Sequence, residues 1–396
     1  MADIILLSNG PGEITRWVRP VVKRIHRELP DADLILFIPP CQFATGKEKA
    51  VASQMTDLDR VFSPMEYWKF LLLGNAKRWS RDGVILRLGG DLIHPILLSR
   101  RFKYPRYAYT EDDFEWSNRY RKFLVPDEQA ADLGREKAAP EKIEVVGNLM
   151  VDGVEIAASN VQRPMSKVNS KVLFLPGSRR FQVSYMVPFF LEAAERLLSG
   201  SKGMEISLLV SEFISRDELE EALRDSARGS SISGDLNGDR VVLASGREVR
   251  LILGDKIGAM KETDLAVTIP GTNTAELAIL GTPMLVLFPL NKPEEIPLKG
   301  MGWFADLVPV AGKWIKRKVI NKGVQNLEFI ALPNIKANRR IVPELVGILT
   351  PDQVAAKVET LLDDRKGMEQ QRKDLGGIMG SGGAAGRIVD IIKGGI

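Results

Sequence analysis

The sequence predicts an α/β protein made of two doubly wound parallel-sheet domains that face each other. Short apolar runs alternate with helical patterns in both halves of the 396-residue chain. A polar segment around 160–170 separates the halves, as an interdomain linker would. Residues 268–290 read strand, turn, helix, strand, which is the βαβ unit of a parallel sheet.

Strands are predicted in the first half where short apolar runs occur: Ile4–Ser8, Leu34–Ile38, Val84–Leu88, Tyr107–Tyr109, Lys122–Val125 and Glu144–Val146. Apolar spacing of about 3.6 residues predicts a helix over Ile14–Leu29. The second half is predicted to hold strands Val172–Leu175, Glu205–Val210, Arg240–Ala244, Ala266–Ile269 and Met284–Phe288, and helices Val187–Leu198, Asp217–Ala227, Gly258–Glu262 and Ala275–Leu280. Arg247–Ile257 is expected to be a connection, and Pro351–Arg365 and Arg387–Lys393 are expected to be helices.

This pattern places an N-terminal domain at 1–163 and a C-terminal domain at 164–350. Residues 351–396 are expected to form C-terminal helices that pack back on the N-terminal domain.

The composition, with 44% hydrophobic and 27% charged residues, is that of a globular protein. A net charge of +4 suits an anionic substrate or membrane surface and is too small to indicate nucleic acid. The single cysteine, Cys41, excludes an internal disulfide, and two histidines leave little material for a metal centre or a Ser-His-Asp triad. No metal is therefore expected.

The expected location is the cytoplasm, either free or at a membrane face. The chain runs from Met1 straight into a strand without a signal-like segment, and no apolar stretch approaches the ~20 residues of a membrane span. The oligomeric state is not fixed by the sequence, a homodimer being one option.

The turn at 270–274 has the composition of a phosphate site, because Gly271 lets an anion approach a helix N-terminus. Thr272, Asn273 and Thr274 add donors, and Glu276 could accept hydrogen bonds from sugar hydroxyls. An ordinary turn using Gly and Thr as caps is the alternative.

A second turn, in the same half, consists of Gly177, Ser178 and Arg179 after an apolar strand. The forked guanidinium of Arg179 matches a diphosphate and would neutralise charge on a leaving group. A surface arginine pair with Arg180 is the weaker alternative.

In the first half, the strand ending at Ser8 leads into Asn9, Gly10, Gly12 and Glu13. This begins like a dinucleotide fingerprint, but Thr15 stands where the third glycine is needed, so a nicotinamide cofactor is not expected. The glycines leave space for another molecule. Glu13 is either a functional carboxylate or a complement to the helix dipole.

Asp91 follows Gly89–Gly90 at the end of another strand, where ligands bind in open α/β sheets. It is a candidate general base for a substrate hydroxyl, and a helix N-cap is the alternative. His94 could pair with it, although a position in a turn before Pro95 is favoured.

Residues 65–81 are dense in leucines and aromatics and end in basic residues. Trp68, Phe70, Leu72 and Trp79 are therefore candidates for contact with a membrane or a lipid chain. A core helix with a basic end is the alternative. The basic run 313–318 is interpreted as a solvated loop.

Several segments resemble lipid-A-disaccharide synthases, which are inverting glycosyltransferases with the two-Rossmann-domain GT-B fold and a cleft between the domains. The similar segments are FLPGSR at 174–179, PGTNTAEL at 270–277, LPNIKANRRIVPELVG at 332–347 and VVGNLMVDGV at 145–154. GPGE at 10–13 and GGD at 89–91 stand where the family has Gly-Glu-Ala-Ser-Gly-Asp and Gly-Ile-Asp.

The resemblance implies that Asp91 and Glu13 match the family's essential aspartate and N-terminal glutamate. It also implies that Arg179 and Glu276 contact the UDP part of a UDP-sugar donor. It implies a lipid or glycolipid acceptor at the inner membrane face, and no metal.

The chain departs from the family in its first half. Asn148 replaces the histidine of Gly-His-Pro-Leu, Ile14–Arg16 replaces Ser-Gly-Asp, and Leu92–Pro95 replaces Ala-Pro-Asp-Phe. Asn9, Gly10, Gly12 and Asn148 are placed on the acceptor side, and the acceptor need not be that of lipid A.

These observations predict an inverting transferase that moves an N-acetylglucosamine-type sugar from UDP to a hydroxyl, with domain closure limiting hydrolysis. A UDP-N-acetylglucosamine 2-epimerase, or a sugar-nucleotide or lipid-binding protein without activity, is the alternative. An NAD-dependent oxidoreductase is the least favoured.

Overall fold

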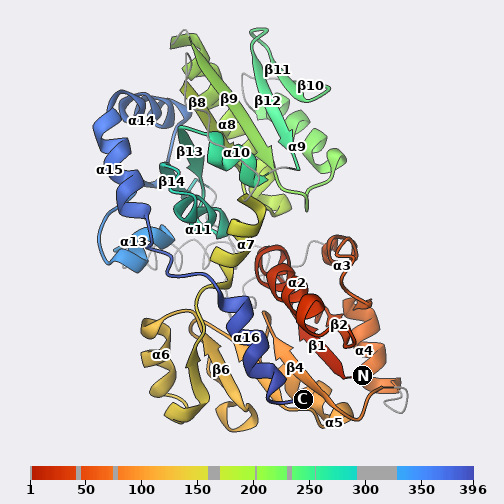
Figure 1. Ribbon diagram of the computed structural model, residues 1–396. Coiled ribbons are helices and arrows are strands. Elements are labelled where there is room, and N and C mark those ends of the chain that lie inside the picture. Colours follow the sequence, from red (N-terminus) through yellow and green to blue (C-terminus); the bar gives the residue numbers. More distant parts are fainter. Residues whose placement is uncertain are drawn as a thin grey trace, which may run out of the picture. The chain divides into compact units, whose positions relative to one another are not determined.

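The computed structural model describes residues 2–41, 46–74, 79–158, 170–200, 203–229, 234–254, 256–291 and 328–396 (Figure 1). The chain divides into two compact units. Unit 1 comprises Met1–Ser159 and Gly380–Ile396, and unit 2 comprises Asn160–Met379.

Unit 1 is built on a seven-stranded, all-parallel sheet in the order β3-β2-β1-β4-β5-β6-β7. Its strands are β1 (Asp3–Leu7), β2 (Asp33–Phe37), β3 (Arg60–Phe62), β4 (Gly83–Arg87), β5 (Arg106–Tyr109), β6 (Lys122–Val125) and β7 (Ile143–Val145). Its longer helices are α2 (Arg19–Glu28), α4 (Pro64–Leu73), α5 (Ile93–Phe102), α6 (Glu128–Arg135), α7 (Leu149–Ala158) and α16 (Ala384–Lys393), with the short α1 (Pro11–Glu13) and α3 (Glu48–Ala52) and the 3-10 turns η3 (Ser117–Arg119) and η4 (Pro140–Lys142).

The helix expected over Ile14–Leu29 is present but contains a π-helical turn, η1 (Ile14–Val18), before α2. Val18, Val21, Val22 and Ile25 are buried against the sheet, which explains the 3.6-residue spacing of the sequence. Strand β3 was not predicted, because three half-buried residues give too short an apolar run.

Unit 2 is built on an eight-stranded sheet in the order β10-β11-β12-β9-β8-β13-β14-β15. Its strands are β8 (Ser170–Leu175), β9 (Met204–Val210), β10 (Gly234–Asn237), β11 (Arg240–Leu243), β12 (Glu248–Leu253), β13 (Leu265–Thr268), β14 (Met284–Pro289) and β15 (Glu344–Gly347). Its helices are α8 (Arg180–Gly200), α9 (Arg216–Gly229), α10 (Lys256–Glu262), α11 (Thr272–Ile279), α13 (Leu332–Ala337), α14 (Pro351–Asp363) and α15 (Arg365–Leu375).

The predicted class of two doubly wound, mainly parallel sheets is confirmed, but the connection expected at Arg247–Ile257 is wrong. Strand β12 occupies much of that connection, and β10, β11 and β12 pair antiparallel at one edge. Only Val249 and Leu251 of β12 are fully buried, since polar residues alternate with them. This half-buried pattern is typical of an antiparallel edge, and it gives no continuous apolar run.

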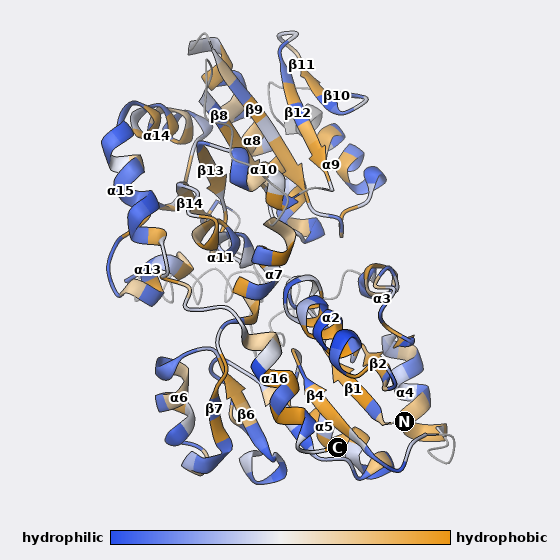
Figure 2. Cartoon of the chain, in the orientation of Figure 1, coloured by the Kyte–Doolittle hydropathy of each residue, from blue (hydrophilic) through white to orange (hydrophobic). Residues whose placement is uncertain are grey.

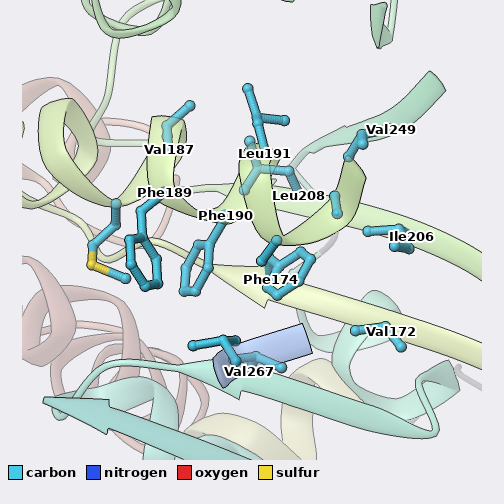
Figure 3. Packing of buried hydrophobic residues seen from close by; sticks show 14 of the residues in the cluster. Val172, Phe174, Val187, Phe189, Phe190, Leu191, Ile206, Leu208, Val249 and Val267 are labelled. Atoms are coloured by element: carbon cyan, nitrogen blue, oxygen red, sulfur yellow. The ribbon is translucent and has the colours of Figure 1, made fainter. Parts of the chain in front are cut away.

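The core of unit 2 lies between the sheet and α8. Phe174 of β8 stacks on Phe190 of α8 with ring centroids 4.7 Å apart, and aliphatic residues of β9 and β13 pack around them (Figure 3). In Figure 2 the strands β1, β4 and β9 are mostly hydrophobic, whereas α15 is mostly hydrophilic. Burial of the strands on both faces explains why they read as continuous apolar runs.

The segment expected to pack on the N-terminal domain, 351–396, is divided between the units. α14 packs on α8 in unit 2, and only α16 packs on α2 and α7 in unit 1. The physical reason is that Val354 and Val358 of α14 complete the core of unit 2.

Candidate functional site

Each sheet has one point where the chain reverses its direction of winding. In unit 1 this switch point lies between β1 and β4, which pair in parallel, and in unit 2 it lies between β8 and β13. Crevices outside the carboxyl ends of strands at such points are the usual ligand sites of open α/β sheets.

The strand register brings the two glycine turns of unit 2 together. Leu175, the last residue of β8, pairs with Thr268, the last residue of β13. The turns 176–179 and 270–274 therefore leave the same edge of the sheet from neighbouring strands. Sequence separates these turns by about ninety residues, so only the sheet order places them together.

The turn after β13 leaves open space at its glycine. Gly271 is the N-cap of α11, with φ of 154°, and a Cβ at this position would meet no atom within 4 Å. Gly271 and Thr272 are exposed. The hydroxyl of Thr274 instead donates to the Gly271 carbonyl at 2.8 Å, so this threonine fixes the turn.

The turn after β8 is held by a residue that the sequence did not indicate. The side-chain oxygen of Gln182 accepts the backbone N–H groups of Ser178 at 3.2 Å and Arg179 at 3.3 Å. Gly177 has φ of 101°, a conformation that favours glycine. A glutamine in the first turn of a helix is the signal that could have identified this cap.

Glu276 is buried within unit 2. It is 1% exposed, and its Oε2 lies 2.6 Å from Nζ of Lys256, which begins α10. Lys256 is 27% exposed and was not predicted. A charge pair thus lies behind the turn at 270–274, where a bound hydroxyl would compete with the lysine for the carboxylate.

The switch point of unit 1 contains a half-buried carboxylate. Leu7 at the end of β1 pairs with Arg87 at the end of β4. Glu13 accepts the backbone N–H of Gly10 at 3.0 Å and the Ser8 hydroxyl at 3.5 Å. A Cβ on Gly89 would lie 2.0 Å from Oε2 of Glu13, so only glycine allows this approach.

The charge of Glu13 is set by its surroundings. Burial raises the pKa of Glu13, and the positive charge of Arg87 and the hydrogen bonds from Gly10 and Ser8 oppose this only in part. Arg87 is buried, donating through Nε to the Gly90 carbonyl at 2.8 Å and through Nη1 to the Tyr109 carbonyl at 2.7 Å. This arginine was not predicted, although a charge inside the apolar run of β4 was a signal.

Asp91 lies at the same edge and is exposed to solvent. Its Oδ1 accepts the backbone N–H of Ile93, the first residue of α5, at 2.8 Å, while the N-cap residue itself is Leu92. His94 is in the first turn of that helix, and its Nδ1 lies 2.8 Å from the hydroxyl of Tyr67. Burial lowers the pKa of His94, and the charge of Asp91 opposes the shift.

The predicted acceptor-side residues lie in two places. Asn9 and Gly10 are in the turn after β1, and Gly12 is in α1; Nδ2 of Asn9 donates to the Pro40 carbonyl at 3.4 Å. Asn148 follows the edge strand β7 and is 2% exposed. Its Oδ1 accepts the N–H of Met150 at 2.8 Å, and its own N–H donates to Ser381 at 2.9 Å.

The four membrane candidates divide into two pairs. Phe70 is buried, and Trp79 packs on Phe70 and Phe102 with ring centroids 5.2 and 4.8 Å apart. Trp68 and Leu72 are exposed on α4, together with Met65 and Leu73. The predicted basic residues 77 and 78 and the run 313–318 lie outside the described residues.

The segment 332–347 has a structural role in unit 2. The fully buried Asn334 accepts the N–H groups of Ile341 at 2.7 Å and Val342 at 2.8 Å, and donates to Glu344 at 2.9 Å. Glu344 also accepts the N–H of Ala331 at 2.7 Å. These bonds tie α13 to β15 at the sheet edge.

Solved structures show that this fold is the two-domain GT-B type. UDP-GlcNAc 2-epimerase from Neisseria meningitidis, bound to UDP-GlcNAc, matches with a TM-score of 0.61 at 13% identity, covering 100% of both chains. UDP-GlcNAc 2-epimerase from Methanocaldococcus jannaschii matches with a TM-score of 0.56 at 15% identity, again over 100% of both chains. Likeness at this identity concerns the fold alone.

The sequence comparisons show a relation to one family. Residues 137–294 match the family model described as lipid-A-disaccharide synthetase. The lipid-A-disaccharide synthase of Syntrophus aciditrophicus is 24% identical over 62% of this chain and 55% of its own length, and that of Geobacter metallireducens is 28% identical over 55% and 47%. The chain is related to the lipid-A-disaccharide synthase family, and it spans about half the length of the curated relatives it matches.

Among the described residues, no helix is both long and apolar enough to cross a membrane.

Proposed function

We propose that this protein is an inverting glycosyltransferase that moves an N-acetylglucosamine-type sugar from UDP to a hydroxyl of a lipid-linked or glycolipid acceptor. The observation that carries the proposal is the pairing of β8 with β13, which brings the turns 176–179 and 270–274 to one switch point. The family match supports it, since 137–294 includes both turns. The proposal requires no metal.

The donor would bind at the unit 2 switch point. Arg179 and Ser178 would contact the diphosphate. The backbone N–H groups of Gly271–Asn273 would also bind it, because Gly271 has no side chain to block the approach. Glu276 would accept a ribose hydroxyl, in exchange for part of its contact with Lys256. When the bond to the sugar breaks, negative charge develops on the diphosphate of UDP. A fixed arginine there would stabilise this charge as it develops.

The acceptor hydroxyl would be deprotonated by a carboxylate of unit 1. The raised pKa of Glu13 brings it closer to neutral pH, where a general base works well. Asp91 offers the more accessible group, since it is exposed and its Oδ1 is the oxygen that accepts the N–H of Ile93. The oxygen would then attack the anomeric carbon on the face opposite UDP, and the bond to the diphosphate would break.

The exposed face of α4 would contact the lipid or the cytoplasmic face of a membrane. Met65, Trp68, Leu72 and Leu73 recur at helical spacing and are 81%, 46%, 73% and 77% exposed. Leaving four large apolar side chains in water is unfavourable, which supports an apolar partner. The guanidinium of Arg101 fixes the end of this helix by donating to the carbonyls of Leu72 at 3.1 Å and Gly74 at 3.3 Å.

A UDP-GlcNAc 2-epimerase is the second candidate, because solved epimerases share the fold over the whole chain. Epimerisation needs no acceptor. Incubation with UDP-GlcNAc alone would then yield a C2 epimer, whereas a transferase leaves the sugar nucleotide unchanged until an acceptor is added.

A binding screen followed by a transfer assay tests the proposal. We expect UDP-sugars to bind and GDP- and dTDP-sugars to bind more weakly, in calorimetry. We then expect UDP release to depend on an added lipid extract. Binding of UDP without release in any extract would indicate a non-catalytic binding protein and contradict the proposed transfer.

A further inference from the structure

We propose that a cavity between α2, α7 and α16 of unit 1 binds the phosphate group of an anionic ligand. The cavity has a volume of about 680 Å³ and is lined by none of the residues at the two switch points. It therefore concerns a second ligand, and it is independent of the proposed transfer reaction.

Three helices form the walls of this cavity. α2 contributes Lys23, Arg24 and Arg27, on one face at helical spacing. α16 lies beside α2 (Figure 1) and contributes Arg387 next to Gly386. A Cβ on Gly386 would approach only the Arg24 guanidinium, at 3.5 Å, so the space beside the glycine is bounded by a cation.

The carboxylates near the cavity leave part of this positive charge uncompensated. Asp152 on the α7 wall accepts the N–H of Ala385 at 2.7 Å and also that of Gly383. Asp390 lies 3.7 Å from Lys393, and Glu28 pairs with both Arg24 and Lys393. Glu155 is the remaining acidic residue of the lining, and it is exposed.

Three cations lack such a partner in the described part of the chain. Lys23, Arg27 and Arg387 form no ion pair with a described carboxylate, although the charge of Arg27 also acts on Glu28 and helps to lower its pKa. Arg387 is nevertheless held in place, because it donates through Nε to the Val146 carbonyl at 2.6 Å and through Nη2 to the Gly382 carbonyl at 2.6 Å. A guanidinium fixed by neutral carbonyls keeps its full charge and loses little freedom on binding an anion.

The ligand class follows from these charges and from the volume. Two or more cations around one space favour a phosphate or diphosphate, whose oxygens each accept a charge-assisted hydrogen bond. The volume exceeds that of a bare phosphate and falls in the range of small-molecule sites, roughly 300–1,000 Å³. The phosphate could belong to a soluble molecule or to a lipid headgroup, and the experiment separates these sources.

The test is hydrogen–deuterium exchange with two probes, pyrophosphate and phosphatidylglycerol vesicles. We expect peptides of α2 and α16 to become protected, by pyrophosphate if the source is soluble and by vesicles alone if it is a headgroup. Protection near 176–179 and 270–274 would report the proposed donor site instead. The two claims can therefore fail separately.

Variants locate the binding. Lys23→Ala with Arg27→Ala should weaken the apparent affinity at the α2 and α16 peptides at least about tenfold. Gly386→Glu should do the same by adding a carboxylate, in a helix position where Glu is preferred over Gly. The matched control, Arg135→Ala at the end of α6 with Lys137→Ala just beyond it, removes the same charge and should change the affinity less than about twofold.

Protection of α2 and α16 that survives both cavity variants would overturn the proposal. A lack of protection with both pyrophosphate and vesicles would also overturn it. Equal weakening in the α6 control would also overturn it, because net charge alone would then explain the binding.

Discussion

The two switch points use the same elements, a glycine turn after each of two parallel strands, but they differ in what the glycines admit. In unit 1 a Cβ on Gly89 would lie 2.0 Å from Glu13, and one on Gly90 would lie 2.9 Å from Asn9. In unit 2 a Cβ on Gly177 would lie 2.5 Å from Gln182, but one on Gly271 would meet nothing within 4 Å. The first glycines make room for the protein's own polar groups, whereas Gly271 leaves room for something else.

The difference favours separate roles for the two switch points in the proposed reaction. Unit 1 brings a buried arginine and a carboxylate of raised pKa to its switch point, which would suit the proton transfer of the proposed reaction. Unit 2 leaves an open turn at 270–274, and Arg179 follows the end of the neighbouring strand, which would suit the anion of the proposed donor. We therefore expect substitutions at the unit 1 switch point to affect turnover, and those at the unit 2 switch point to affect the affinity for UDP.

The largest expected effect is on turnover. Asp91→Asn or Glu13→Gln, whichever is the base, should lower kcat roughly 10²–10⁴-fold, because the acceptor hydroxyl loses its proton acceptor. The UDP affinity of both variants should stay within about twofold of wild type, measured by calorimetry. If both variants turn over normally, the proton-transfer role of unit 1 is excluded.

Gly89→Ala should produce the next largest effect, destabilising the protein by roughly 1–3 kcal/mol through overpacking against Glu13. Chemical denaturation measures the change. In a double-mutant cycle, Glu13→Ala should relieve most of the cost, because it removes the atom that the new methyl group would meet. Additive effects of the two substitutions would show that Gly89 is not constrained by Glu13.

A smaller effect concerns the pH dependence of stability. The folded-state pKa of Glu13 lies above its ordinary value of 4.5, so the fold favours the protonated form. The favourable contribution of protonated Glu13 to the free energy of unfolding is present below the unfolded-state pKa, and it is lost as pH rises through the folded-state pKa. Glu13→Gln should therefore gain in Tm relative to wild type between pH 5 and pH 8. A difference that does not change over this range would contradict the raised pKa.

The smallest expected effect on stability is at α4. Trp68→Ser with Leu72→Ser should change the free energy of unfolding by less than about 0.5 kcal/mol, since both side chains are exposed. The same variant should lose most of its cosedimentation with lipid vesicles. The contrasting variant, Phe70→Ala, should destabilise by about 3–5 kcal/mol because Phe70 is buried. Unchanged vesicle binding by the serine variant would remove α4 as the lipid contact.

The fold could be predicted wherever a strand is buried on both faces. The runs at β1, β4, β8, β13 and β14 are continuous and apolar, and they gave the two-sheet architecture within one or two residues. β12 and β3 were not predicted, because partial burial interrupts the apolar run.

The site could be predicted as turns but not as contacts. The turns Gly177–Arg179 and Gly271–Thr274 could be predicted from their residue types and from their position after a strand. The cap by Gln182 is a local contact, and its place in the first turn of α8 was a signal. The pairing of Lys256 with Glu276 could not be assigned, since it depends on packing between α10 and α11. Asn334 shows the opposite case, where a segment that resembles the family holds the sheet edge together.

The most direct test of the account is UDP binding by two neighbouring arginine variants. Arg179 follows the tight turn, whereas the exposed Arg180 pairs with Glu221 at 2.7 Å. In calorimetry, Arg179→Ala should weaken UDP binding roughly 10–100-fold, since a charge-assisted contact to phosphate is worth about 1.5–3 kcal/mol, and Arg180→Ala should leave it within about threefold. Wild-type affinity in Arg179→Ala, or an equal loss in both variants, would contradict the assignment of the unit 2 switch point as the donor site.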